Sequence, residues 1–224
     1  MTFVIEKIQA FLFHFISPFV NSRNQYNTKR FKILKFYNFL IWWILIPLKF
    51  LEIFGLSHLL NHIFKWTTKS RQLNKYEIEF LTTVFPSSIN YKVIRINENS
   101  KWAKIGAKNT KKHHLAFVWM NTINFTRPIN CSVNDSDLRW LVHEMVHITQ
   151  FKALGIQYIF EALLAQKFGD YNYGGKQNLK EHQLNYFNLE QQADIIKDYV
   201  LDLSQKNDVE IYQPYLKDLN NFKF

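Results

Sequence analysis

The pattern of apolar and polar positions divides the chain into an N-terminal helical part and a mixed C-terminal part. Over residues 1–20, apolar side chains recur at three- and four-residue spacings with polar ones between them, which predicts an amphipathic helix. Residues 36–54 form the most apolar stretch of the chain. At about 1.5 Å rise per residue, a helix of this length approaches the roughly 30 Å thickness of a membrane interior.

Three polar or helix-breaking residues qualify that membrane interpretation of residues 36–54. Pro47, Lys49 and Glu52 fall near one end of the stretch. They favour a segment that lies in the membrane interface as readily as one that crosses it. A hydrophobic hairpin that packs on the rest of the protein is the alternative.

The middle of the chain has the composition of short β-strands. Residues 76–85 (YEIEFLTTVF), 91–96 (YKVIRI) and 115–125 (LAFVWMNTINF) are rich in β-branched and aromatic residues. The polar stretch 97–112 separates the second segment from the third. We therefore expect two or three strands in a small sheet.

From Ser136 onward the apolar spacing becomes helical. Asp135, Ser136 and Asp137 offer N-caps for a helix that Gly155 would end. Two more helices are predicted at 157–168 and 189–203, with a loop after the first of them. The fold class is thus α+β, with a hydrophobic helical region over residues 1–70 and a second domain over residues 71–224.

Composition and charge favour a folded protein that contacts an anionic surface. Hydrophobic residues make up 47% of the chain and the net charge is +10. Basic residues flank the apolar stretch, which suits a phospholipid surface better than nucleic acid, for which no binding motif is present. We expect a membrane-associated protein, or otherwise a cytoplasmic one or one exported by a non-classical route. The alternative is that these basic residues are ordinary solvent-exposed lysines and arginines that bind no surface.

Two further features concern processing and oxidation. Glu6 precedes Lys7, and no small-residue cleavage site follows the first apolar run, so we expect no cleavable signal peptide. Cys131 is the single cysteine, which excludes an internal disulfide.

The segment His143-Glu144-Met145-Val146-His147 has the H-E-x-x-H pattern of a zinc site. On a helix, residues four apart point the same way, so His143 and His147 can share one metal ion. Glu144 lies about 100° further round the helix, where it can act as a general base without being a ligand. Chance would produce this pattern roughly 0.01 times in a chain of this composition. The other histidines lack such a pattern and are predicted not to be ligands.

A catalytic zinc usually has three protein ligands, and residues 188–194 (NLEQQAD) supply the third. Glu190 and Asp194 stand four apart on the predicted helix, so they share a face. Glu190 is the expected ligand. Asp194 is expected to accept a hydrogen bond from a ligand imidazole, which fixes its tautomer. The alternative for both is an exposed helix face.

HEMVH followed by EQQAD resembles the gluzincin branch of the zincin metallopeptidases. The longer stretch from HEMVHITQ, including Gln150, to FNLEQQADIIKDY is similar to bacterial Vgr- or Rhs-related metallopeptidases. That group lies near the domain of contractile injection systems that is marked by H-E-x-x-H-x-x-Q. The resemblance covers residues 76–215.

The resemblance implies a zincin-like fold and a zinc-dependent hydrolase acting on peptide bonds. His143, His147 and Glu190 would be the ligands, Glu144 the base, and the edge strand of the sheet would lie above the cleft. No histidine follows Glu190 to stabilise the transition state, so the candidates for oxyanion or substrate binding are Tyr158, Tyr171, Tyr173 and His182. Two alternative functions stay open, a non-catalytic part of a secretion or injection apparatus and a membrane-active effector.

Overall fold

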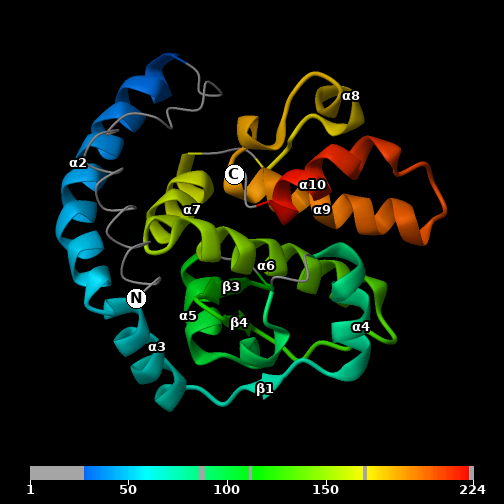
Figure 1. The fold of residues 1–224 in the computed structure, drawn as a ribbon, viewed down its shortest axis with the longest axis horizontal. Helices are drawn as coiled ribbons and strands as arrows, with labels where there is room; N and C mark the ends of the chain where they lie inside the picture. The colour runs from blue at the N-terminus through cyan, green and yellow to red at the C-terminus, as the bar shows by residue number, and fades with distance from the viewer. Residues whose placement is uncertain (1–27, 86–88, 111–112, 169–170, 222–224) are drawn as a thin grey trace.

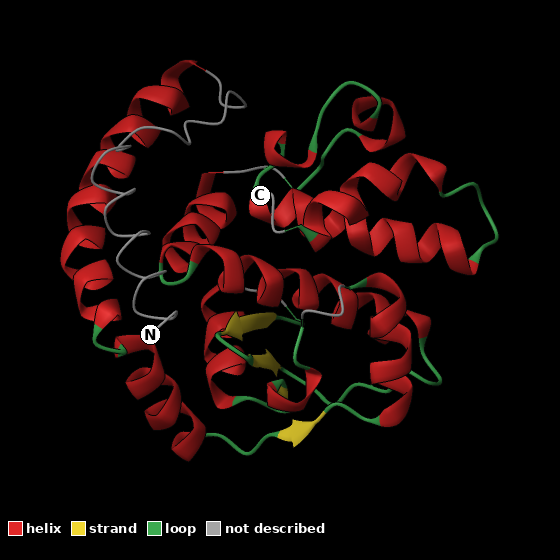
Figure 2. Ribbon diagram, in the orientation of Figure 1, coloured by secondary structure: helices red, strands yellow, loops and turns green. Residues whose placement is uncertain are grey.

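The computed structural model describes residues 28–85, 89–110, 113–168 and 171–221. They form an α+β fold with a small four-stranded mixed sheet and many helices, which confirms the predicted class (Figures 1 and 2). The amphipathic helix predicted for residues 1–20 lies outside the described residues.

Two N-terminal helices form an arc along one side of the molecule (Figure 1). They are α2 (Thr28–Ile53) and α3 (Leu56–Thr67). Pro47 lies inside α2, and Gly55, at a φ of 83°, stands between the two helices. Among the described helices, none combines the length and the apolarity needed to cross a membrane.

The sheet has the strand order β1-β2-β4-β3. Its strands are β1 (Arg71–Gln72), β2 (Arg95–Asn97), β3 (Ala116–Trp119) and β4 (Thr122–Phe125). β2 and β4 are parallel, and the outer pairs are antiparallel. All four residues of β4 are buried, whereas β3 forms one edge of the sheet.

The prediction that residues 76–85 have β structure was wrong, because this segment forms α4 (Lys75–Val84). Asn74 and Glu77 make a reciprocal capping box at its start. The buried residues Glu77, Leu81 and Val84 follow the helical spacing. Local capping and burial on one helix face thus outweigh β-type composition.

Residues 91–112 also differ from the prediction. Tyr91–Val93 form the 3-10 turn η1, so β2 begins only at Arg95. The polar stretch taken as a separator contains α5 (Lys101–Thr110), which buries Ala103 and Ala107, one helical turn apart. Two small apolar residues at this spacing are enough to seat a largely polar helix on the domain.

The C-terminal half is helical. Its elements are α6 (Asp135–Leu154), α7 (Gln157–Phe168), α8 (Gly175–Leu179), η2 (Leu184–Tyr186), α9 (Leu189–Ser204), η3 (Glu210–Tyr212) and α10 (Gln213–Asn220). Gly155 ends α6 with a φ of 59°, as predicted, and the bounds of α7 agree with the prediction. The predicted loop after α7 includes the short helix α8. In Figure 1, α6 crosses the middle of the molecule, between the sheet and α9.

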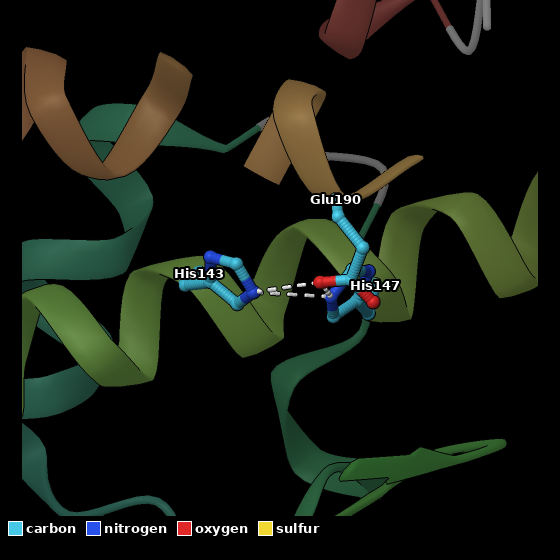
Figure 3. A group of neighbouring side chains, drawn as sticks. All are labelled: His143, His147 and Glu190. Atoms are coloured by element: carbon cyan, nitrogen blue, oxygen red, sulfur yellow. Dashed lines mark hydrogen bonds and ion pairs between the residues drawn. The ribbon is translucent and has the colours of Figure 1, made fainter. Parts of the chain in front are cut away.

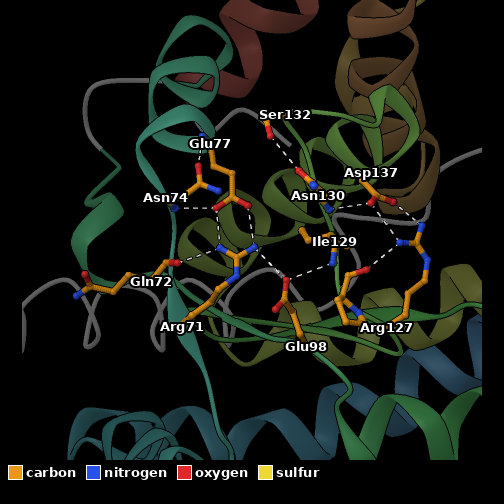
Figure 4. Close-up of polar contacts among 11 residues, drawn as sticks. Arg71, Gln72, Asn74, Glu77, Glu98, Arg127, Ile129, Asn130, Ser132 and Asp137 are labelled. Carbon is orange, nitrogen blue, oxygen red and sulfur yellow. Dashed lines mark hydrogen bonds and ion pairs between the residues drawn. The ribbon is translucent and has the colours of Figure 1, made fainter.

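The start of α6 is capped differently from the prediction. Asn134, rather than Asp135, Ser136 or Asp137, is the N-cap, and its side chain accepts from the Ser136 N–H. Asp137 instead accepts hydrogen bonds from the Arg127 guanidinium and from the Asn130 N–H at 2.8 Å (Figure 4). The ion pair joins α6 to the chain that leaves the sheet.

A second ion pair, between a partly exposed arginine and a buried glutamate, joins the sheet to α4. Both guanidinium nitrogens of Arg71 donate to the Glu77 carboxylate at 2.8 Å (Figure 4). Arg71 also reaches Glu98 at 3.1 Å, and Glu98 accepts from the Ile129 N–H. These contacts hold the sheet in place beneath α6, and α6 carries the candidate site.

Candidate metal centre

A cleft of about 1110 Å³ lies between the edge strand of the sheet and helices α6, α7 and α9. All four residues of β3 line it, together with His143, Glu144 and His147 of α6. Glu190 and Asp194 of α9 line it as well. Residues that are far apart in the sequence therefore meet at one surface.

His143, His147 and Glu190 form a group that could hold a metal ion, with ligand atoms all within 4.8 Å of one another. The Nε2 atoms of the two imidazoles are 3.2 Å apart. Oε2 of Glu190 is 3.5 Å from each of them (Figure 3). The two histidines come from neighbouring turns of α6, and Glu190 comes from the first turn of α9, which Asn188 caps.

The hydrogen bonds at the opposite ring nitrogens assign the tautomers of both imidazoles. Nδ1 of His143 lies 2.9 Å from the Asp194 carboxylate, and Nδ1 of His147 lies 2.7 Å from Oε1 of Gln150. A carboxylate and an amide oxygen both accept, so each Nδ1 carries a proton, and each Nε2 offers its lone pair once a metal ion replaces any proton there. Both Nε2 atoms face Glu190.

Gln150 cannot turn its amide around without losing two other hydrogen bonds. Its Nε2 donates to the Leu189 carbonyl at 3.0 Å and to Oε1 of Gln192 at 2.8 Å. Gln192 in turn donates to the carbonyls of Leu184 and Phe187. A chain of buried amides thus fixes the His147 ring from behind and connects α6 to α9.

The donor set fits a small divalent cation. Three acceptor atoms that converge without a proton between them repel one another unless a positive charge lies among them. Ligand atoms about 2.0 to 2.1 Å from a tetrahedral ion lie about 3.3 to 3.4 Å apart. The measured separations of 3.2, 3.5 and 3.5 Å bracket that value.

The charges around the group also favour a cation. Burial opposes the protonated form of His143, but the carboxylates of Asp194 and Glu190 outweigh it and raise its pKa to about 10. Burial likewise opposes the ionised form of Glu190, yet the two imidazoles hold its pKa well below the usual range. The carboxylates that favour a proton on the imidazole also favour a metal ion at the same nitrogen. Because the ion and the proton compete for that nitrogen, metal binding would release protons.

Glu144 is buried beside His143, His147 and Glu190, but it is not one of the three possible metal ligands. The residue is 4% exposed, and its Oε2 makes no hydrogen bond within the described part of the chain. Burial raises the pKa of this carboxyl. Glu144 therefore lines the cleft next to the three possible ligand atoms without being one of them.

The structure brings some of the remaining candidates to the cleft and not others. Tyr158 and Tyr171 line it, and the Tyr158 ring lies 5.8 Å from that of His147. Tyr173 lies elsewhere and donates to Asp198. His182 stacks on Tyr186 and lies away from the cleft. Neither Tyr173 nor His182 lines the cleft.

Gln166 and Gln192 were not singled out from the sequence. Gln166, on α7, donates to Oε1 of Glu190 at 3.0 Å and so leaves Oε2 facing the imidazoles. Gln192 orients Gln150. Full burial of Gln192 on the apolar face of α9 follows from tertiary packing, and Gln166 carries no sequence signal at all.

Comparisons with protein-family models, with curated proteins and with solved structures found no match to this chain.

Proposed function

We propose that this protein is a zinc-dependent metallopeptidase of the gluzincin type, with a zincin-like catalytic domain. The observation that carries the proposal is the convergence of three ligand atoms from His143, His147 and Glu190 beside the buried Glu144. Two imidazoles and one carboxylate leave a fourth position on a tetrahedral ion, as a hydrolytic site requires. The relation to Vgr- and Rhs-related proteins stays a prediction.

Zinc is the proposed metal because of the donor set. Two neutral imidazoles with one carboxylate suit zinc, whereas magnesium and calcium prefer all-oxygen sites. Asp194 and Gln150 supply the hydrogen bonds at Nδ1 that zinc-binding histidines generally have. Zinc in such a site is a Lewis acid that makes water acidic near neutral pH and polarises a carbonyl oxygen.

The side chains of the cleft have separate tasks in the proposed reaction. The Glu144 carboxylate accepts a proton from the attacking water and then donates it to the nitrogen of the leaving amine. Tyr171 lines the cleft and is 37% exposed, and we propose its hydroxyl as the donor to the oxyanion. Burial raises the pKa of Tyr171, so its hydroxyl stays protonated near neutral pH.

The edge of the sheet supports a peptide as the substrate. β3 is the last strand in the described sheet order and lines the cleft along its whole length. The backbone groups at such an edge can pair with an extended peptide, which would then run past Glu144. Phe117 and Trp119 offer apolar contacts to its side chains.

The burial of Glu144 favours catalysis over a purely structural role for the domain. A site kept only to stabilise the fold needs its ligands but not a further buried carboxylate that is no ligand, because burying its charge destabilises the folded state. Within the described part of the chain, Oε2 of Glu144 accepts no hydrogen bond that would offset this cost.

The test is hydrolysis of a peptide library by the Glu144→Gln variant, with zinc and with a chelator. We expect the variant to bind zinc as the unaltered protein does and to lose at least about 100-fold in kcat, because glutamine cannot take up the proton. Glu181→Gln, at an exposed glutamate, is the matched control and should keep full activity. Unchanged hydrolysis by Glu144→Gln would refute the proposal.

The ligand assignment has its own measurement. His147→Ala removes one of the three donor atoms, so elemental analysis of the purified variant should find the zinc lost. A zinc content equal to that of the unaltered protein contradicts the assignment.

A further inference from the structure

α2 turns an apolar side outward, and its described charged residues, Lys49 and Glu52, lie on the opposite side. Seven large apolar residues along one side of the helix and at its end are exposed, and we call them the apolar stripe: Phe39, Leu40, Trp43, Ile44, Phe50, Leu51 and Phe54. Trp43 is 55% exposed and Phe54 is 74% exposed. A helix on the surface of a protein in water ordinarily has the opposite arrangement.

The opposite side of α2 is fixed to the domain. Leu45 is buried, Lys49 donates to Oε1 of Gln157 on α7 at 2.8 Å, and Glu52 is 4% exposed. At about 100° per residue, Leu45, Lys49 and Glu52 lie half a turn around the helix from the apolar stripe. The two charges that interrupt the apolar segment in the sequence therefore do not interrupt its outer face.

α3 extends the exposed apolar surface. Leu59 and Ile63, one helical turn apart, are both more than half exposed. The Phe64 ring lies 5.7 Å from that of Trp119 on β3, which holds α3 against the sheet. Figure 1 shows α2 and α3 as one arc along the outside of the molecule.

The charge of α2 indicates what covers the apolar stripe. Lys29, Arg30, Lys32 and Lys35 fall in its first turns, and Glu52, which is buried, is its only acidic residue. A helix whose sequence is basic at its start and whose later turns expose aromatic side chains matches the headgroups and the acyl boundary of an anionic bilayer. A protein partner would have no general need for this combination.

We propose that α2 and α3 dock this protein on the surface of an anionic phospholipid bilayer, with the apolar stripe in the lipid and α2 parallel to the membrane plane. The parallel orientation follows from the contacts of Lys49 and Glu52, because a helix held along one side by the domain offers only its other side to lipid. This inference does not depend on the proposed peptidase activity.

Vesicle flotation of the full chain tests the docking. The double variant Trp43→Glu/Phe54→Glu puts two charges on the apolar stripe, whereas Trp102→Glu/Val133→Glu puts two charges at exposed apolar residues elsewhere. We expect the unaltered protein and the second variant to float with phosphatidylcholine–phosphatidylglycerol vesicles. The first variant should bind at least about tenfold more weakly. Binding to pure phosphatidylcholine should be weaker, and salt should reduce the difference.

A site-specific label supplies a second measurement if a double variant folds poorly. Cys131 is only 2% exposed, so a thiol-reactive environment-sensitive dye should label Ile44→Cys on the apolar stripe selectively. Vesicles should shift its emission to the blue, while the dye on Ile105→Cys of α5 should not respond.

Three outcomes would overturn the docking. In one, the unaltered protein binds neither kind of vesicle, and the emission of the dye at position 44 does not shift when vesicles are added. In another, Trp43→Glu/Phe54→Glu floats as well as the unaltered protein. In the third, sedimentation shows a dimer that this variant disrupts while vesicles bind neither, so that a second copy covers the apolar stripe.

Discussion

At the scale of single residues, each imidazole of the metal centre is held by a hydrogen bond on the side away from the metal position. Asp194 holds His143, and Gln150 holds His147. The first partner is charged and lies near Lys197, which pairs with it, whereas the second is a neutral amide within a buried chain. The two ligands are therefore oriented by independent contacts.

Gln150→Leu should weaken zinc binding about 10- to 100-fold, because His147 loses the acceptor that fixes its tautomer. Competition with a chelating dye measures the change in Kd. Gln177→Leu, at an exposed glutamine of α8, is the control and should bind zinc normally. Equal affinities for Gln150→Leu and Gln177→Leu would mean that Gln150 does not act on the metal centre.

Tyr171→Phe should lower kcat about 10- to 100-fold with little change in zinc content, because the hydroxyl acts only as the oxyanion forms. Tyr173→Phe is the matched control, since Tyr173 lies away from the cleft and donates to Asp198. Steady-state kinetics on one peptide substrate compares them. If Tyr173→Phe loses as much activity as Tyr171→Phe, the assignment to Tyr171 fails.

At the scale of elements, α6 is fixed by a contact at its start and by the turn at its end, and the candidate ligands lie between them. Its first turn is tied to the chain after β4 by the Asp137–Arg127 ion pair, and its middle turns carry the ligands. Gly155 ends it and lets α7 turn back to supply Gln166 to Glu190. The position of the ligands therefore depends on contacts well outside the cleft.

The Asp137 ion pair should make stability depend on pH. Burial would raise the pKa of the Asp137 carboxyl, but the hydrogen bonds from Arg127 and the Asn130 N–H outweigh it and lower the pKa. A lowered pKa means that the ion pair stabilises the fold above the unfolded value of about 3.9. That contribution is lost as the pH falls through the folded value.

Asp137→Asn should therefore cost about 1 to 2 kcal/mol at pH 7, and the difference should shrink below about pH 4. Denaturant unfolding at several pH values measures it. Asp135→Asn is the comparison, because Asp135 lies in the same first turn of α6 without the ion pair. A deficit of Asp137→Asn that stays constant down to pH 3 would rule out this explanation.

At the scale of the whole molecule, the candidate metal centre joins the two helices that form the middle of the fold. His143 and His147 belong to α6 and Glu190 to α9, and α6 separates the sheet from α9 (Figure 1). An ion held by both helices would bind the folded chain and not the unfolded one. We therefore expect metal binding to raise global stability.

Chelation should lower the melting temperature by about 10 °C, since metal at roughly 1,000 times its Kd contributes about 4 kcal/mol. Differential scanning calorimetry with and without chelator measures the shift, and added zinc should restore it. His147→Ala, which lacks a ligand, should show neither effect. A melting temperature that chelation leaves unchanged would exclude the linkage.

The sequence by itself determined the local chemistry and the regular helices. A helical repeat places residues four apart on one face, so the H-E-x-x-H spacing predicted the shared face of His143 and His147. Gly155 predicted the end of α6, and the bounds predicted for the next helix agree with α7. The α+β class followed from the change of spacing along the chain. These features depend on neighbours within a few residues.

Only the tertiary structure decided which distant groups meet. Residues 76–85 became α4 because a capping box and a buried face outweighed β-type composition. Gln166 and Gln192 reached the metal centre through packing of α7 and α9. α2 placed Lys49 and Glu52 on its inner side and exposed the apolar stripe, because contact with α7 selected that side. Long-range packing sets the positions of these side chains, whereas the capping box of α4 is a local pattern.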